Sequence, residues 1–349
     1  MNSYAIVKAD VERDKKDILT ILQRNLDTAS SQRYDWNYVQ CPYGIASCWL
    51  AKCEFSHTLT GSAALFPRKW FVNGKPTCAA VAGDFAIDKK HRGFGPAFKL
   101  QKEILSRARD AGFSFIYGVP NELSRAFFLR IGYIEIGKFK RYIKPIKTEK
   151  VSKEYLPQIL QHKIVLKMAD LVTSIISKEQ RYTKNDKYAV EMPEYFDERF
   201  DALWKDISKQ FIIIGERTAQ FLNWRFKQPS AQRYDIFCIV DENKELAGYI
   251  VYCIKENICH VADMLFKSSE ETIISLLAEF TRHIKTKDVG AIVIRYLGNE
   301  LFQKKLKEFN FFMTKKDNAM VMLYDAGLPS ESCLLDENNW HFFTGDSDV

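Results

Sequence analysis

Residues 88–97 read DKKHRGFGPA and place a cluster of cationic side chains directly before a glycine-rich turn. The preceding segment, 77–87 (TCAAVAGDFAI), is rich in small apolar residues and predicts a buried strand. The segment after the turn, 97–111, repeats apolar residues on one helical face, and Gly112 then offers a C-terminal stop. The stretch is therefore expected to join a strand to a helix, with Pro96 at the first helical position.

A strand that turns tightly into a helix suits an anionic ligand, because the free N–H groups of the first helical turn point toward the chain entering it. Gly93 and Gly95 let the backbone approach such a ligand closely, and Arg92 has the geometry for bidentate phosphate contacts. On these residues alone, a charged surface turn remains the alternative. The dinucleotide fingerprint GxGxxG and the nucleotide-binding Gly-Lys-Ser/Thr are both absent, since Pro-Ala-Phe follows Gly95.

The composition limits the classes of partner. The chain has 349 residues, of which 46% are hydrophobic, enough for two packed domains. Its net charge of +7 is diffuse and lacks the basic stripe with interleaved aromatic residues of a nucleic-acid binder. The 8 cysteines contain no C-x-x-C pair, so no zinc site is expected. Neither a signal peptide nor a long apolar span is visible, so we expect a cytoplasmic protein without a nucleic-acid or membrane partner.

Strand-like and helix-like segments alternate through the first 145 residues. The Asn73-Gly74 pair marks a hairpin turn. The predicted strands are 4–10, 47–53, 61–72, 77–87 and 113–119, and the predicted helices are 11–26, 97–111 and 120–133. This alternation is typical of an α/β or α+β domain.

The second half of the chain echoes the first. Three pairs of segments correspond in the same order: 35–42 (DWNYVQCP) with 223–229 (NWRFKQP), 82–87 (AGDFAI) with 261–266 (VADMLF), and 120–133 (PNELSRAFFLRIGY) with 298–311 (GNELFQKKLKEFNF). The second pair matches Asp84 with Asp263, and the third matches Asn121 with Asn299. Three matches in one order predict two copies of one fold.

The copies differ at the glycine-rich turn. The first copy carries HRGFGPA after its aspartate strand, whereas the second carries KSSEETIISLL there. We therefore predict one active half and one degenerate, structural half. The expected domains are 1–147, a helical connector over 148–190, and 191–349. The basic residues near the first boundary, from Lys138 to Lys150, are expected to be a solvated strand end and linker.

Two motifs carry a resemblance to a known family. Arg92, Gly95 and Ala97 occupy the places of the signature Arg/Gln-x-x-Gly-x-Gly/Ala, and residues 117–133 (YGVPNELSRAFFLRIGY) resemble the asparagine-led helix that follows it. Together they resemble the GNAT (Gcn5-related) N-acyltransferase superfamily. The resemblance implies tandem GNAT-like domains of the α/β (α+β) class, each a mixed twisted sheet flanked by helices, with the second copy degenerate.

The resemblance also implies acyl-CoA as a cosubstrate. In the family, backbone amides of the turn bind the pyrophosphate, and the pantetheine pairs with the preceding strand. The residues that this assigns to the cofactor are Phe85, Ala86, Ile87, Arg92, Gly93, Phe94, Gly95, Pro96, Ala97, Asn121, Ser124 and Phe128.

Amine acylation needs a group that takes a proton from the ammonium. Asp84 is the leading candidate for this base, and Asn121 is placed with it as a catalytic residue. A structural role for Asp84 stays open, because Asp263 matches it in the degenerate copy. His57 and Glu122 are weaker candidates.

The chain departs from the family at Phe128, where many members carry a tyrosine that protonates the leaving thiolate. Either another group supplies this proton or the thiolate leaves unassisted. Tyr117 and Tyr133 are the nearby tyrosines in the sequence.

The acceptor is suggested by a looser likeness over nearly the whole chain. Segments such as KFKRYIKP (138–145) and the C-terminal NWHFFTGDSDV (339–349) resemble two-domain N-acyltransferases of bacterial polysaccharide biosynthesis. These imply an acetyl or hydroxybutyryl group moved to the amine of a dTDP-linked amino-deoxysugar. The alternatives are another small amine or a peptide, a transferase that uses aminoacyl-tRNA, and a non-catalytic acyl-CoA-binding protein; a homodimer is left open.

Overall fold

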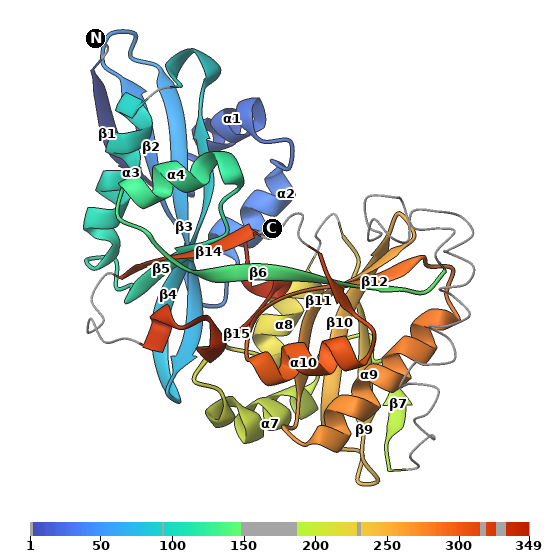
Figure 1. The fold of residues 1–349 in the computed structure, drawn as a ribbon. Coiled ribbons are helices and arrows are strands. Elements are labelled where there is room, and N and C mark those ends of the chain that lie inside the picture. The colour runs from blue at the N-terminus through green and yellow to red at the C-terminus, as the bar shows by residue number, and fades with distance from the viewer. Residues whose placement is uncertain are drawn as a thin grey trace.

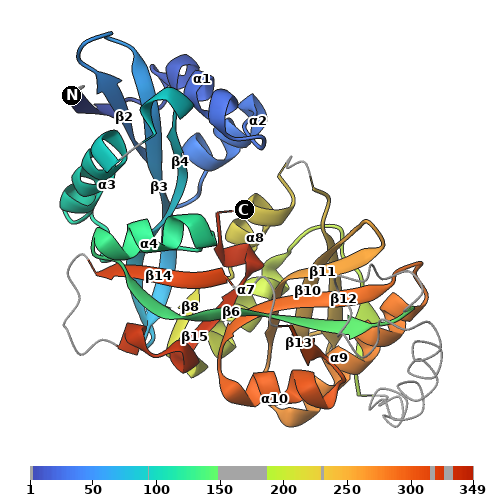
Figure 2. The same ribbon diagram turned by 45° about the horizontal axis from the view of Figure 1, so that its top comes forward.

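The computed structural model describes residues 3–92, 94–147, 187–228, 232–314, 319–325 and 333–348. Figure 1 shows two lobes, and the long strand β6 (Ile134–Pro145) runs from one lobe to the other. The same division is clear in the tilted view of Figure 2, where helix α4 (Glu122–Arg130) lies close above the point at which the lobes meet. Most of the predicted connector 148–190 lies outside the described residues.

The remaining elements before residue 147 belong to the first lobe. They are β1 (Tyr4–Ala9), α1 (Lys15–Asn25), α2 (Ser31–Tyr34), the π-helical η1 (Asp35–Val39), β2 (Ser47–Cys53), β3 (Leu59–Val72), β4 (Lys75–Ile87), the short 3-10 turn η2 (Lys89–His91), α3 (Phe94–Ala108) and β5 (Phe115–Gly118).

From residue 187 the chain forms the second lobe and then returns to the first. Its elements are β7 (Ala189–Glu191), α7 (Glu198–Ile207), η6 (Ser208–Gln210), β8 (Ile213–Gly215), α8 (Ala219–Phe226), β9 (Asp235–Val240), β10 (Leu246–Lys255), β11 (Ile258–Phe266), α9 (Glu270–Lys285), β12 (Ala291–Gly298), α10 (Glu300–Glu308), β13 (Phe312–Met313), β14 (Ala319–Asp325), η7 (Cys333–Leu335), η8 (Glu337–Asn339), β15 (Trp340–Phe343) and η9 (Thr344–Asp346).

Helices cover both faces of the first lobe's sheet because the strands alternate apolar side chains between the two faces. On β3, Ala64 and Phe66 belong to the same core cluster as the α1 residues Ile18 and Leu22. Their neighbours Ala63 and Leu65 belong to the cluster that holds the α3 residues Leu100, Ile104 and Leu105. Helices α1 and α3 therefore lie on opposite faces.

The two lobes exchange strands. The first part of β6 pairs with β14, from Ile134 opposite Leu323 to Phe139 opposite Ala319, while its last part pairs with β12 of the second lobe. Strand β14 also pairs with β5, so a strand made late in the chain fills the position between β5 and β6. One continuous 15-stranded sheet results, in the order β13-β6-β14-β5-β4-β3-β8-β15-β12-β11-β10-β9-β7 with β2 and β1 branching from β3.

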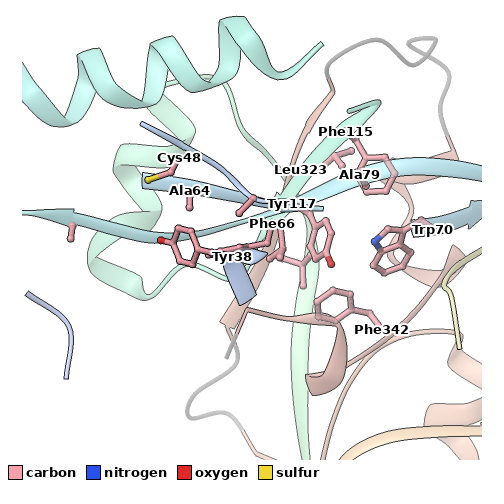
Figure 3. Close-up of a cluster of buried hydrophobic side chains, with 14 of the residues drawn as sticks. Tyr38, Cys48, Ala64, Phe66, Trp70, Ala79, Phe115, Tyr117, Leu323 and Phe342 are labelled. Carbon is pink, nitrogen blue, oxygen red and sulfur yellow. The ribbon is translucent and has the colours of Figure 1, made fainter. Parts of the chain in front are cut away.

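The core of the first lobe contains residues from both ends of the sequence (Figure 3). Trp70 on β3 lies with its ring centroid 5.3 Å from Tyr117 and 5.0 Å from Trp340, and it stacks on Phe342 at 6.2 Å. Leu323 of β14 is buried in the same cluster. The N-terminal lobe therefore completes its apolar core only with residues that follow the second lobe in sequence.

Several local predictions are confirmed. Asn73 and Gly74, both at positive φ, form the hairpin turn between β3 and β4. Helix α3 ends at Ala108, and Gly112 follows it at a φ of +84°. The expected place of Pro96 is wrong by two residues, because α3 begins at Phe94; proline is accepted there since the N–H groups of the whole first turn have no intrahelical partner.

The expectation of a solvated strand end near residue 140 is also wrong. Arg141 and Lys144 are buried on β6, and Lys144 Nζ donates to the carbonyl oxygen of Phe309 at 2.5 Å. Lys140 Nζ pairs with Glu337 at 3.1 Å. These side chains are covered because β6 crosses into the second lobe, a long-range pairing that charge patterning does not reveal.

Candidate active site

The site begins where two parallel strands separate. Strands β4 and β5 pair from Ala79 opposite Phe115 to Val81 opposite Tyr117, and β4 then continues to Ile87 after β5 has ended. Its pairing with β3 shifts register between Gly83 and Ala86, and Asp84 within this bulge has a φ of +50°. A bulge redirects a strand, and here it lies where the two strands diverge.

A groove of about 410 Å³ lies along this separated edge. Its walls include the residues expected to bind a cofactor on both sides of the separation: Phe85, Ala86, Ile87, Arg92, Ala97, Asn121 and Ser124, together with Asn25, Leu26 and Phe127. The structure thus brings together two sequence motifs, the glycine-rich turn and the asparagine-led helix. Of the other expected residues, Gly93 lies outside the described residues, as does the side chain of Phe94.

Helix N-termini face the groove from both motifs. Helix α3 opens with Gly95 and Pro96 in its first turn, and a Cβ added at Gly95 would meet only Tyr4 Cε2 at 3.8 Å. Asn121 caps α4 by accepting hydrogen bonds from Ser124 N at 2.9 Å and Ser124 Oγ at 2.5 Å. Each helix directs the positive end of its dipole toward the groove.

Arg92 is fixed at the end of β4. Its Nε donates to the carbonyl oxygen of Ile87 at 3.1 Å, and the residue is otherwise exposed. Nearby, the hydroxyl of Tyr4 and Nδ1 of His91 share a hydrogen bond of 3.1 Å. The hydrogen bond to Ile87 holds the Arg92 guanidinium beside the start of α3, which concentrates positive potential there.

The groove opens into a second cavity of about 760 Å³ between the lobes. The two share Leu26, Phe85, Asn121 and Ser124 as lining residues. The larger cavity is lined from the first lobe by Arg33, Trp36, Asp84, Phe128 and Tyr133, and from later parts of the chain by Arg225, Gln232, Tyr234, Met322 and Asp348. Phe128 therefore lies on the larger cavity and not on the groove.

Asp84 lies on this cavity, with its carboxylate already engaged. Arg33 donates through Nη1 to Oδ2 and through Nη2 to Oδ1, both at 2.9 Å, and the hydroxyl of Tyr38 donates to Oδ2 at 2.9 Å. Burial, followed by the charge of Asp84, raises the pKa of Tyr38 well above its ordinary value. The arrangement holds Asp84 as an ion-paired carboxylate in the position where β4 bulges.

The second lobe repeats this arrangement, but there the side chains are buried. Arg217 pairs with Asp263 on β11 at 3.0 Å, and the hydroxyl of Tyr249 donates to Asp263 at 2.9 Å. Arg217 also pairs with Asp346 at 2.6 Å, and the side chains of Arg217 and Asp263 are each only 1% exposed. Asn299 caps α10 as Asn121 caps α4. The predicted repeat thus corresponds to matching side-chain contacts in the two lobes.

The tyrosines near Phe128 have different surroundings. The hydroxyl of Tyr117 donates to the carbonyl oxygen of Asp346 at 2.7 Å and is unavailable to a substrate. Tyr133 packs edge-on against Phe128 at 4.9 Å and lines the larger cavity. Its hydroxyl is buried and, within the part of the chain that the structure describes, has no hydrogen-bond partner. His57 and Glu122 are exposed and line neither cavity.

Comparison with known proteins agrees with this geometry. Residues 16–133 match the acetyltransferase (GNAT) family. A probable N-acyltransferase from Enterococcus faecalis superposes with a TM-score of 0.67 at 13% identity, over 93% of this chain and 73% of that one. The chain has the GNAT fold. The predicted mixed α/β class with tandem GNAT-like units is confirmed.

Two further solved structures match nearly the whole chain. A GCN5-related N-acetyltransferase from Anabaena variabilis has a TM-score of 0.66 at 14% identity, over 93% of this chain and 73% of that one. An N-myristoyltransferase from Saccharomyces cerevisiae, solved with myristoyl-CoA, has a TM-score of 0.57 at 12% identity, over 97% and 84%. No curated protein sequence is a significant match. At these identities the likeness concerns the fold.

The described residues contain no group of three or more histidine, cysteine or acidic side chains placed to hold a metal ion. Among the same residues, no helix is long and apolar enough to span a membrane. The cysteines of the described part are unpaired and mostly buried, as expected for thiols in apolar strands.

Proposed function

We propose that the chain is an acyl-CoA-dependent N-acyltransferase of the cytoplasm. The observation that carries the proposal is the separated edge of β4, from Ala82 to Ile87, which lies between two helix N-termini and leads into a second cavity. An extended ligand with an anionic end fits this groove, and the second cavity gives an acceptor access to its far end. The family match of residues 16–133 supports the same activity.

In this proposal the pantetheine arm adds to the sheet as an extra strand. Its amides would bond to the β4 edge from Phe85 to Ile87, which β5 leaves unpaired. The pyrophosphate would lie over the start of α3, where the backbone N–H groups of Phe94, Gly95 and Ala97 and the Arg92 guanidinium would meet it. The N-myristoyltransferase of similar fold, solved with myristoyl-CoA, is consistent with a CoA thioester as the ligand.

The reacting thioester would then lie near the bulge at Asp84. A backbone N–H at the bulge would polarise its carbonyl, which is electrostatic stabilisation of the oxyanion type. Asn121 contributes by holding the start of α4 against the groove through its cap. Phe128 and Phe127 pack with Phe85 into an apolar wall that keeps water from the thioester.

For the acceptor we propose the amino group of a dTDP-linked amino-deoxysugar, carrying an acetyl or hydroxybutyryl group after transfer. The larger cavity supports a bulky acceptor, since it offers the aromatic surface of Tyr234 beside the carboxylates of Asp84 and Asp348. Carboxylates suit a protonated amine, and aromatic rings suit a base or sugar face.

A second acceptor class, amines without phosphate, is favoured because the arginines of the same cavity already have partners within the protein. Arg33 is paired with Asp84, and Arg225 donates to the carbonyl oxygens of Gly345 and Ser347 at 2.8 and 3.2 Å. These guanidinium groups are already bonded within the protein, whereas a nucleotide diphosphate needs cationic donors. A small amine or a peptide N-terminus without phosphate is therefore the competing acceptor.

An assay of the free CoA thiol released from acyl-CoA separates these proposals. The full chain is mixed with acetyl-CoA or hydroxybutyryl-CoA and with dTDP-amino sugars, free amino sugars, small amines and short peptides, and CoA binding is measured by calorimetry. Turnover with the dTDP-linked sugars above the free sugars supports the first acceptor class. Equal or faster turnover with unphosphorylated amines supports the second, and CoA binding without turnover across the panel indicates a binding protein.

A further inference from the structure

The C-terminal segment reaches both aspartate–arginine–tyrosine clusters. The first lobe's cluster is Asp84, Arg33 and Tyr38, and the second lobe's is Asp263, Arg217 and Tyr249. It carries two carboxylates, Asp346 and Asp348, on either side of Ser347. Arg225 donates to the carbonyl oxygens of Gly345 and Ser347, and the hydroxyl of Tyr117 donates to the carbonyl oxygen of Asp346. Buried donors therefore hold the backbone of the segment, so its two acidic side chains have defined positions.

Asp346 is fully committed in the second lobe. Its carboxylate pairs with Arg217 at 2.6 Å and accepts a hydrogen bond from Phe343 N at 2.9 Å. Arg217 also pairs with Asp263, the counterpart of Asp84. The carboxylate of Asp346 is 3% exposed, so this cluster is a closed structural site.

Asp348 occupies the related place in the first lobe, beside Asp84. A Cβ added at Gly83 would lie 2.9 Å from Asp348 Oδ2, which places the carboxylate directly against the bulged strand. Here the guanidinium of Arg33 pairs with Asp84, and within the described ranges no ion pair reaches the Asp348 carboxylate. Asp348 instead lines the 760 Å³ cavity. The same segment thus gives one lobe a neutralised carboxylate and the other an available one.

The electrostatic surroundings of Asp348 suit a proton acceptor. Burial and the nearby charge of Asp84 raise the pKa of Asp348, while Arg33 and Arg68 act in the opposite direction. A raised pKa makes a carboxylate a stronger base. Because Asp84 engages Arg33, the Asp348 carboxylate can form a direct ion pair with a cation that enters the cavity.

We propose that Asp348 is a catalytic residue, which binds the ammonium group of the acceptor and takes its proton. Asp84, predicted from the sequence as the base, is then a positioning residue that keeps Arg33 away from Asp348. This inference rests on the proposed N-acyltransferase function and names the base for it.

The step balances as follows. The acceptor ammonium gives one proton to a carboxylate oxygen of Asp348, and the neutral amine nitrogen attacks the thioester carbonyl carbon. The C–N bond forms and the C–S bond breaks, with the electron pair leaving on the CoA sulfur. The second nitrogen proton goes to the thiolate or to water, and Asp348 returns its proton to solvent. An amide and free CoA result.

The test compares two acceptors that differ in charge. Acetyl transfer at pH 7 is measured for the full wild-type chain and for Asp348→Asn, with hydroxylamine, which is uncharged at this pH, and with the best primary alkylamine from the acceptor panel. CoA affinity and thermal stability are measured for both proteins. We expect equal CoA affinity, a loss of roughly 100-fold or more with the alkylamine, and a much smaller loss with hydroxylamine. Asp348→Glu, which keeps the carboxylate, is expected to restore part of the alkylamine rate.

The control is Asp206→Asn on the exposed side of α7, which removes one negative charge from a residue that lines neither cavity and is expected to change neither rate. Equal alkylamine rates in wild type and Asp348→Asn would overturn the assignment, and so would equal losses with both acceptors, which indicate a structural role. Wild-type transfer to hydroxylamine but to none of the alkylamines would overturn it as well. A wild-type chain that binds no CoA would instead refute the proposed function itself.

Discussion

Trp36 and Trp224 donate hydrogen bonds to each other's backbone: Trp36 Nε1 to the carbonyl oxygen of Trp224 at 2.8 Å, and Trp224 Nε1 to that of Trp36 at 3.1 Å. Their rings stack with centroids 5.1 Å apart. The two residues are equivalent in the sequence repeat, so the reciprocal bonds mark a local two-fold relationship between the lobes. Both indoles are buried, and Arg225 covers the Trp36 ring from the cavity side.

Replacing either tryptophan by phenylalanine should weaken the lobe contact. Each change removes one donor and leaves a buried carbonyl unpaired, which costs about 1–3 kcal/mol. Because the two bonds share the same pair of residues, the double variant should deviate from additivity by about 0.5–3 kcal/mol. Urea unfolding of the single and double variants measures this coupling.

Trp204→Phe is the matched control for loss of indole volume, since Trp204 is similarly buried and packs edge-on against Phe71. Additive effects of the Trp36 and Trp224 changes would show that the reciprocal bonds do not act as a unit.

Gly95→Asp tests the groove. The new carboxylate would lie at the start of α3, where the proposal places the pyrophosphate, and like charges brought together cost several kcal/mol. We expect CoA affinity to fall by roughly 100-fold or more. Gly95→Ala is the control: its Cβ has room, with Tyr4 Cε2 at an ordinary 3.8 Å, and should leave affinity nearly unchanged. Calorimetry measures CoA affinity for wild type and both variants. Unchanged affinity in Gly95→Asp would show that the pyrophosphate does not bind at this turn.

Local features of the fold were predictable because they depend on neighbouring residues. The hairpin at Asn73, the end of α3 before Gly112 and the cap at Asn121 each follow from backbone geometry and hydrogen bonding within one turn. The repeat also gave the equivalence of Asp84 with Asp263. Both members of that pair proved to have an arginine and a tyrosine as partners.

Long-range pairing was not predictable in this way. No local pattern indicates that β14 enters the first lobe or that Lys144 is buried, because both depend on contacts between distant segments. The approach of Asp348 to Asp84 has the same origin. Its sequence signal was limited to an acidic pair in a C-terminal aromatic segment, and the partners of that pair become visible only when both lobes are folded.

His341 should make stability depend on pH. The ring is buried, and Nε2 donates to the carbonyl oxygen of Met264 at 3.0 Å. Burial, reinforced by Arg217, lowers the pKa of His341 from 6.5 to about 4. Between these values the unfolded chain binds more protons than the folded one, so the free energy of unfolding should fall as pH drops from about 6.5 to about 4. The contribution is about 3 kcal/mol at most.

Urea unfolding at several pH values, for wild type and His341→Gln, measures this contribution. The variant cannot take up a proton at this position, so its stability should fall less steeply over the same interval. Parallel curves for the two proteins would assign the acid sensitivity to other groups.

Tyr133→Phe should separate folding from function. The change removes a buried hydroxyl that has no partner in the described structure, so stability should stay equal or rise slightly. If the hydroxyl serves the bound substrates, acyl transfer should fall by about 10-fold or more. The control is Tyr117→Phe, which leaves the carbonyl of Asp346 without its donor and should cost about 1–2 kcal/mol of stability. An unchanged transfer rate in Tyr133→Phe would make the residue a packing element alone.

The position of β14 between β5 and β6 also sets an order of events during synthesis. Residues up to 145 leave the ribosome with a gap in their sheet, and the strand that fills it emerges only after the entire second lobe has been made. Until then the open edges of β5 and β6 are exposed to wrong pairing. Because Asp348 follows later still, the site proposed here stays incomplete while either lobe is being made. The catalyst can therefore form only after the chain has been synthesised through residue 348.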